Sequence, residues 1–260
     1  MFRLMSHTYA GICRAFGLVL MVVGLGACTV YAPMQPTMPL LDAKGQAEFS
    51  GSLQPNGRVE ATAAYSPAAH LLLTAGGTVR PKLEKVNFLV TRQYELGVGG
   101  YLPLGTAWQL NGIGGYGQAF SHRSFLEDGF FIASSRREYR ARYHKYFAQA
   151  GIAHVDDWNN FGFTYRLTQV RFSSLTDAEL GKLPLTNMLR HEAMFFWRRP
   201  FPRGYNWETL ATVGLSIGPR LEPNDFQNPY GPTERAANHT LRSVLFTSLG
   251  LVYHPAWGGR

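Results

Sequence analysis

The stretch 93–99, with the sequence Gln-Tyr-Glu-Leu-Gly-Val-Gly, decides the fold, because its side chains alternate between two classes. One face of an extended chain would carry Tyr94, Leu96 and Val98, and the other would carry glutamine, glutamate and glycine. A soluble sheet needs an aliphatic inner face, whereas a transmembrane barrel turns its apolar face to lipid and its polar face inward. The stretch therefore predicts a strand of a membrane-spanning β-barrel.

The same period of two recurs along the chain from residue 46 onward, and no segment shows a convincing helical period. Near the C-terminus, for example, Leu215, Ile217, Leu249 and Leu251 would all lie on outward faces. A soluble barrel or sandwich with the apolar faces inside would show the same period, so it stays an alternative. The predicted strands cover residues 46–54, 58–66, 69–80, 89–102, 107–122, 135–155, 158–173, 188–199, 204–219 and 240–254.

The lengths of the connections favour the membrane barrel. The even-numbered connections are short, at 67–68, 103–106, 156–157 and 200–203. Of the odd-numbered connections, the third, fifth, seventh and ninth are longer and more polar. Only the first of them, Pro55-Asn56-Gly57, is short, and its Asn-Gly pair is a strong signal for a hairpin turn. Outer-membrane barrels have this asymmetry, with short periplasmic turns and long extracellular loops.

The N-terminal region predicts a lipoprotein. Leu25-Gly26-Ala27-Cys28 matches a lipobox, and it closes a short apolar run behind Arg3 and Arg14. The prediction is a cleaved signal peptide at 1–27, palmitate and other acyl chains on Cys28, and a proline-rich extended tether at 28–45 before the barrel domain at 46–255 and a tail at 256–260. Thr29 is not the aspartate that retains lipoproteins at the inner membrane, so we expect the outer membrane, with the anchor on its periplasmic side. An uncleaved signal anchor or a buried helix is the alternative.

Composition excludes several classes of protein. The 260 residues are 13% aromatic and 16% charged, and their formal net charge is +8. The basic residues are scattered, so we expect no nucleic-acid partner. They would either lie near anionic lipopolysaccharide, which attracts cations, or lie in exposed loops that are simply solvated. Cys13 would leave with the signal peptide and Cys28 would carry lipid, so we expect no disulfide and no cysteine metal site. We expect no metal and no cofactor elsewhere in the chain. The expected partners are outer-membrane lipid and the lipoprotein-processing and barrel-assembly machineries.

Charged residues gather on the predicted inner face. They could form an ion-pair network that fills a narrow lumen, or a polar conduit or acid/base site. Ten strands enclose too little space for a wide porin channel. The predicted inner set is Glu48, Glu60, Glu95, Glu192 and Glu208 with Arg166, Arg190, Arg198 and Arg242.

Residues for an outer-rim hydrolase are present but not in a diagnostic spacing. His122 and His239 could pair with an aspartate of the predicted loops, and Ser121 precedes His122. The glycine-rich runs 97–100 and 112–117 precede no predicted helix, so they are not phosphate loops. The candidate aspartates are Asp128, Asp177 and Asp225.

The order of lipobox, proline-rich tether and glycine- and aromatic-rich barrel, opening at Gly45-Gln46-Ala47-Glu48-Phe49, resembles uncharacterised outer-membrane β-barrel lipoproteins of Bacteroidota. The resemblance implies a barrel and an envelope location but no activity. We therefore expect a lipid-anchored, structural or surface-binding barrel. The alternatives are an outer-membrane hydrolase of lipid or peptide, and a periplasmic lipocalin-like lipoprotein.

Overall fold

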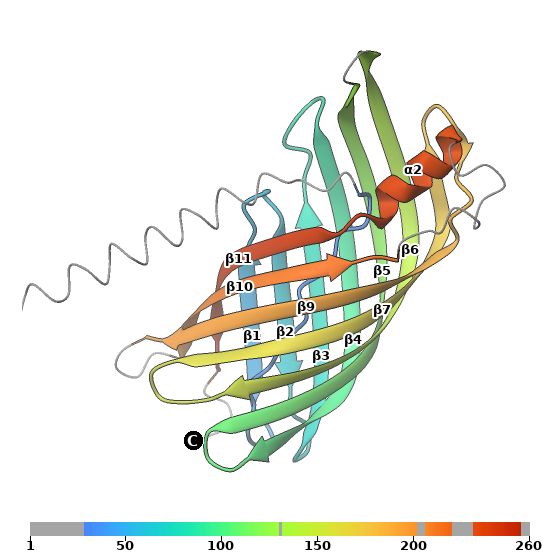
Figure 1. Cartoon of the computed structure of the whole chain (residues 1–260). Coiled ribbons are helices and arrows are strands. Elements are labelled where there is room, and N and C mark those ends of the chain that lie inside the picture. The colour runs from blue at the N-terminus through green and yellow to red at the C-terminus, as the bar shows by residue number, and fades with distance from the viewer. Residues whose placement is uncertain (1–28, 130–131, 202–205, 220–230, 256–260) are drawn as a thin grey trace, which may run out of the picture.

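The chain forms a closed antiparallel β-barrel in a computed structural model that describes residues 29–129, 132–201, 206–219 and 231–255 (Figure 1). Each long strand pairs with its neighbour, β6 also pairs with β7, and β1 pairs with β11, which closes the ring. The elements are β1 (Ala47–Leu53), β2 (Val59–Tyr65), β3 (Leu71–Arg80), β4 (Phe88–Leu104), β5 (Trp108–Gly129), β6 (Ile132–His154), β7 (Asn160–Asp177), the two-residue β8 (Gly181–Lys182), β9 (Asn187–Pro200), β10 (Trp207–Ile217), α2 (Pro232–Leu241) and β11 (Val244–Tyr253).

The predicted barrel of ten strands is confirmed, since each predicted range overlaps one of the ten long strands, although β5, β6 and β7 extend further toward the long connections than predicted. The expectation that no helix forms is wrong, because α2 occupies 232–241 and the last strand begins at Val244. Pro232 suits the first helical turn, and Ala236, Ala237 and Thr240 bury one face of the helix. The helix is short and polar elsewhere, so its period was hard to see. No described helix is long and apolar enough to cross a membrane.

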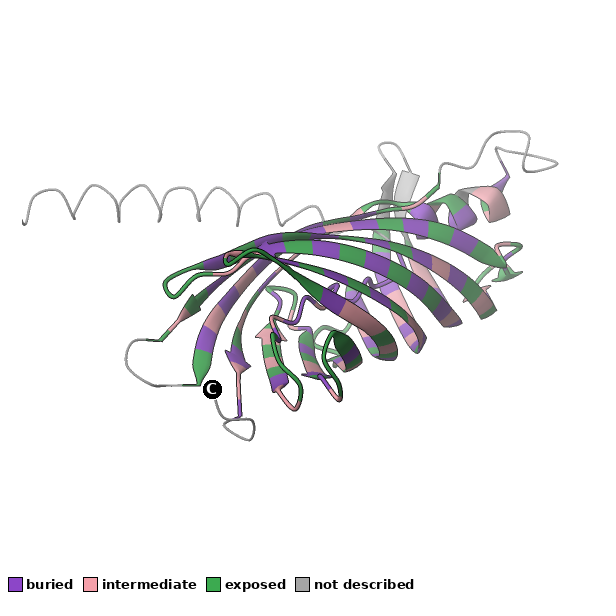
Figure 2. Ribbon diagram, turned by 90° about the horizontal axis from the view of Figure 1, so that it is seen from below, coloured by how far each residue is buried: buried purple, intermediate pink, exposed green. Residues whose placement is uncertain are grey.

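Apolar side chains cover the outside of the barrel. Leu96 and Val98 are each 56% exposed, and Leu249 is 53% exposed. Exposed and buried residues alternate along the strands in Figure 2, as the period of two predicted. This outward aliphatic face excludes the alternative of a soluble sandwich with the same faces packed inside, and it fits a lipid-facing belt.

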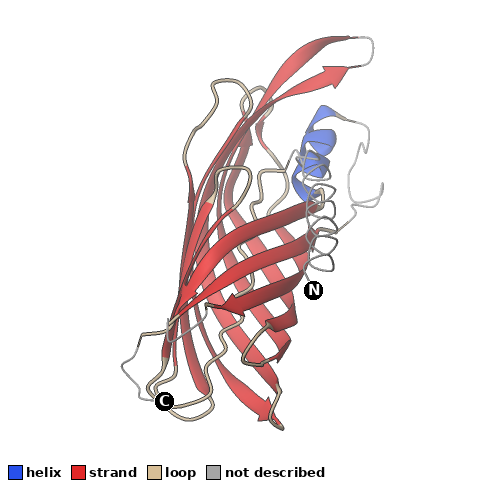
Figure 3. Ribbon diagram, turned by 90° about the vertical axis from the view of Figure 1, so that its left-hand side faces the viewer, coloured by secondary structure: helices blue, strands red, loops and turns tan. Residues whose placement is uncertain are grey.

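The two rims of the barrel differ. At one, which we call the short-turn rim, brief turns join β2 to β3, β4 to β5, β6 to β7 and β9 to β10, and both the start of β1 and the end of β11 lie there. The helix α2, drawn in blue in Figure 3, lies toward the other end of the barrel. The opposite rim, the long-connection rim, carries the 81–87 and 178–186 connections, the β5–β6 hairpin and α2. The predicted segregation of short and long connections agrees with this arrangement.

The inside of the barrel is occupied by the chain itself. Residues 29–41, which we call the lumen segment, pass between the walls, and all except Thr37 and Leu40 are buried (Figure 1). Residues 29–41, predicted as part of a tether ahead of the barrel, therefore lie inside the barrel. The predicted signal peptide and Cys28, at 1–28, and the tail at 256–260 lie outside the described residues.

The lumen segment gives the barrel an apolar core. Tyr31, Met38 and Leu41 each belong to a different cluster of buried hydrophobic side chains from the wall. Tyr31 packs near the long-connection rim with Tyr143 and Leu241, whereas Leu41 packs nearer the other rim with Leu72 and Tyr101. The interior is thus less polar than the sequence alternation suggested, because apolar side chains of the segment meet apolar inward residues.

Candidate functional site

The amino-terminal end of the lumen segment is hydrogen-bonded to the helix α2 and to the barrel wall. The Thr29 hydroxyl donates a hydrogen bond to the carbonyl oxygen of Thr240, at 2.7 Å. The Tyr31 hydroxyl donates to Oε1 of Glu192, at 2.7 Å, and the Arg190 guanidinium lies 4.9 Å from the centre of the Tyr31 ring. Residue 29 therefore lies at the long-connection rim.

Proline spacing explains why the segment stays extended and needs the wall. Pro33, Pro36 and Pro39 recur every third residue, which matches the three-residue turn of polyproline II. That conformation has no internal hydrogen bonds, so a buried main chain must find other partners. Wall side chains donate to five of its carbonyl oxygens: Gln93 to Ala32 at 2.8 Å, Arg58 to Pro33, Gln149 to Thr37 at 2.6 Å, Arg198 to Met38 at 2.7 Å and Gln109 to Leu41 at 2.8 Å.

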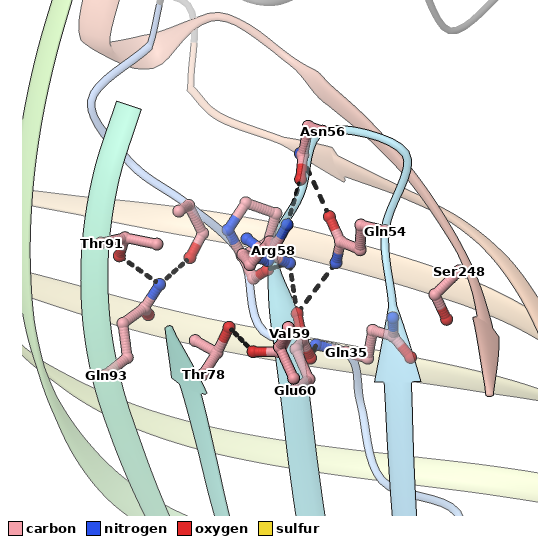
Figure 4. Close-up of polar contacts among 12 residues, drawn as sticks. Gln35, Gln54, Asn56, Arg58, Val59, Glu60, Thr78, Thr91, Gln93 and Ser248 are labelled. Carbon is pink, nitrogen blue, oxygen red and sulfur yellow. Dashed lines mark hydrogen bonds and ion pairs between the residues drawn. The ribbon is translucent and has the colours of Figure 1, made fainter. Parts of the chain in front are cut away.

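Two buried carboxylates accept from the amide groups of the segment. Glu60 accepts from the Gln35 amide at 3.1 Å, and Glu48 accepts from the Leu40 amide at 3.0 Å. Figure 4 shows Gln35 and Arg58 beside Glu60. Inward side chains of both charge signs, from β1 to β9, thus form hydrogen bonds with the main chain of the segment.

Glu95 lies at the centre of the network on one wall. Its two carboxylate oxygens contact Lys145 Nζ at 2.6 Å and Arg166 Nη1 at 2.9 Å. Arg166 also donates twice to Oε1 of Gln149, at 3.0 and 2.7 Å. Because Gln149 in turn holds the Thr37 carbonyl, this ion-pair group is continuous with the lumen segment.

A second charged group joins the segment to the strands beside the closing seam of the barrel. Arg198 contacts both oxygens of Glu48, with Nη1 to Oε2 at 2.9 Å and Nη2 to Oε1 at 3.1 Å. Glu208 lies 3.9 Å from Arg198, and His254 lies 3.5 Å from Glu208. These contacts link β1, β9 and β10 through their inward side chains.

The structure places all but one of the predicted inner residues inside the barrel, with Glu192 bonded to Tyr31, Thr168 and Ser216. The inward prediction for Arg242 is wrong. It follows the end of α2, its side chain is exposed, and its carbonyl oxygen accepts from Arg190. The sequence reasoning missed Arg58 and Lys145, although both alternate in phase with the inward Glu60 and Tyr143.

Little free space remains along the segment. Two cavities between it and the wall have volumes of about 30 and 10 Å³, which is room for very few waters. A larger cavity of about 800 Å³ opens at the short-turn rim, below Leu40 and Leu41. The segment, rather than solvent, therefore fills the middle of the barrel.

The predicted hydrolase residues do not come together. Ser121 is buried and donates to Thr91 at 3.2 Å, whereas His122 lies on the other face with Nε2 2.7 Å from Glu138. Asp177 caps a turn by accepting from the amides of Glu179 and Leu180.

The remaining candidates do not complete a site either. His239, in α2, lies 6.0 Å from the Phe125 ring. The side chain of Asp128 and the whole of Asp225 lie outside the described residues. Among the residues that the structure describes, no three His, Cys, Asp or Glu side chains are grouped to hold a metal ion.

Comparisons with known proteins show likeness of fold only. No family model and no curated protein matches the sequence. The outer membrane protease OmpT from Escherichia coli superposes with a TM-score of 0.51 at 10% identity, covering 81% of this chain and 93% of that one. The translocator domain of the autotransporter NalP from Neisseria meningitidis covers 95% of this chain and 97% of that one, at 14% identity and a TM-score of 0.39. The chain thus has the fold of outer-membrane β-barrel proteins, at an identity too low to transfer an activity.

Proposed function

We propose that this protein is a lipid-anchored outer-membrane barrel that serves as a structural or surface-binding envelope protein and does not conduct solutes. The observation that carries the proposal is the lumen segment, which fills the barrel and is bonded to the wall along its length. An internal ligand of the lipocalin kind would find that space already taken.

The charged wall supports a structural role better than a conduit. A buried charge is stable only when it is paired and hydrogen-bonded, and leaving one partner alone is costly. Glu95 pairs with both Lys145 and Arg166, and Glu48 pairs with Arg198. Glu48 and Arg198 bond to the lumen segment directly, whereas Lys145 and Arg166 reach it through Gln93 and Gln149, so both groups act as its supports.

The long-connection rim supports a surface-binding role. The β5–β6 hairpin continues to Gly129, and Arg137 Nη1 at its base pairs with Glu179 at 2.9 Å. Outer-membrane barrels place their long loops outside the cell. We infer that this rim, with α2, offers the surface that an extracellular ligand would meet.

Outer-membrane lipid is the proposed partner of the barrel wall. Arg92 and Arg142 are exposed, flank Phe120 on adjacent strands, and line an open cavity of about 570 Å³. Arg92 lies two residues closer to the long-connection rim than the lipid-facing Tyr94. Guanidinium groups at that height suit the phosphates of lipid headgroups in the outer leaflet.

Conductance tests the proposal. Purified protein, shown to be folded by its heat-modifiable gel migration, should give no steady current in planar bilayers at neutral pH. A double substitution of the segment's supports, Gln93→Ala with Gln149→Ala, should produce intermittent openings. Stable, open currents from the unmodified protein would overturn the proposal.

Lipidation is tested separately. Cells supplied with labelled palmitate should label the protein, and Cys28→Ala should abolish the label. A labelled Cys28→Ala variant, or an unlabelled parent, would contradict the anchor.

A further inference from the structure

The direction of the lumen segment decides where the amino terminus emerges. Thr29 is bonded to Thr240 at the long-connection rim, and Leu41 is bonded to Gln109, one residue into β5 from the short-turn rim. The chain then turns at the short-turn rim and enters β1 at Ala47. The segment therefore descends the whole barrel before the first strand begins.

Thr29 is the first residue that the structure describes, so the described chain begins at the long-connection rim. Short turns of outer-membrane barrels face the periplasm and long connections face outward. We propose that the barrel displays its own lipid-anchored amino terminus on the cell surface, with residues 29–41 as the internal passage from the first strand to the outside. This inference rests on the proposed lipidation of Cys28 and reverses the side of the membrane expected from sequence.

Packing around the segment indicates that the barrel closes around it. The two cavities between the segment and the wall measure about 30 and 10 Å³, too small to admit an acyl chain beside the segment. The seam between β1 and β11 pairs only from Phe49 with Tyr253 to Leu53 with Leu249, and it is the shortest seam of the closed ring. Glu48, next to this seam in β1, accepts a hydrogen bond from the Leu40 amide, so the segment is bonded to one of the two strands that close the ring.

Contacts at the amino-terminal end of the segment hold it in this direction. Tyr31 is 1% exposed, and it is held both by Glu192 and by the Arg190 guanidinium. Arg190 in turn donates to the carbonyl oxygens of Leu241 and Arg242, at the end of α2. Wall, helix and segment are therefore fixed to one another at the rim where Cys28 would emerge.

Accessibility in intact Gram-negative cells tests the inference. A recognition site for a sequence-specific protease is inserted between Cys28 and Thr29 of the full-length protein. Matched controls carry the same insert between Glu84 and Lys85, at the long-connection rim, or between Asp156 and Asp157, at the short-turn rim. We expect protease added to intact cells to cut the first two variants, and to cut the third only after the outer membrane is opened.

The opposite result would overturn the inference: an N-terminal site that is protected in intact cells and becomes cleavable together with the Asp156 insert. Palmitate labelling of the same variant separates the two proposals, because a missing label refutes the anchor whereas a labelled but protected site refutes only surface display. A disulfide-forming pair, Thr29→Cys with Thr240→Cys, needs no insertion. It should cross-link within the folded barrel, and failure to do so under oxidation would refute the placement of residue 29.

Discussion

Replacing Arg198 with methionine tests whether the lumen segment and the wall are one cooperative structure. The side chain is 4% exposed, makes a two-point contact with Glu48, and donates to the Met38 carbonyl at 2.7 Å. Methionine keeps much of the apolar stem but leaves the Glu48 charge buried beside a single amide donor, that of Leu40. Breaking a buried pair in this way costs about 3–5 kcal/mol.

The double variant Glu48→Gln with Arg198→Met isolates the cause. It removes the uncompensated charge, so we expect it to lose about 2 kcal/mol less than Arg198→Met alone. The control is Arg199→Met, because Arg199 is adjacent, has the same side chain and is exposed on the outer face. A surface change of that kind should alter the free energy of unfolding by no more than about 0.5 kcal/mol.

The assay is urea unfolding of the barrel in lipid vesicles, with the folded fraction read from the difference in gel migration between folded and unfolded protein. The midpoint for Arg198→Met should fall well below that of Arg199→Met at an unchanged slope. Equal midpoints for the two single variants would show that Arg198 is not buried against Glu48, and would refute the reasoning about the segment.

Three further substitutions have expected outcomes. In Gly99→Ala the new Cβ would lie 2.0 Å from the carbonyl oxygen of Gly112, so assembly measured by heat-modifiable migration should fall, whereas Gly112→Ala, with its nearest neighbour at 3.9 Å, should assemble normally. Tyr31→Phe removes the 2.7 Å bond to the Glu192 carboxylate, and the free energy of unfolding should drop by about 1–3 kcal/mol; an unchanged urea midpoint would contradict that bond. Met38→Ala empties part of a buried cluster and should cost about 2–5 kcal/mol in the same titration, so a loss typical of an exposed site would count against its burial.

The wall of the barrel was predictable from sequence because its determinants are local. Alternation at Tyr94, Leu96 and Val98 specifies a strand and, through the polar residues between them, the side that meets lipid. The inward positions of Glu48, Glu95 and Arg198 follow from the same period. Arg242 departs from this alternation because it directly follows α2, and the two-residue period of a strand does not continue through a helix.

The interior was not predictable in the same way, because it depends on contacts between distant parts of the chain. Nothing local to Pro33, Pro36 and Pro39 distinguishes a solvated tether from a buried one, since both are extended and lack internal hydrogen bonds. The feature of the sequence that could have indicated the buried segment is the set of uncharged amide side chains among the inward residues. Their nitrogens donate hydrogen bonds to carbonyl oxygens of the segment, and they belong to Gln93, Gln109 and Gln149.

A barrel that faces lipid exposes the apolar surface that would otherwise form its core, so its inside needs another source of cohesion. The lumen segment supplies this in two forms. Tyr31, Met38 and Leu41 provide buried apolar side chains to three separate clusters, and the main chain between them accepts the hydrogen bonds of otherwise stranded polar groups. At Met38 and Leu41 both forms of contact meet in one residue, so sliding the segment by one residue would mismatch its apolar contacts and its hydrogen bonds together. That mismatch fixes the register of the segment, and with it the rim at which the amino terminus leaves the barrel.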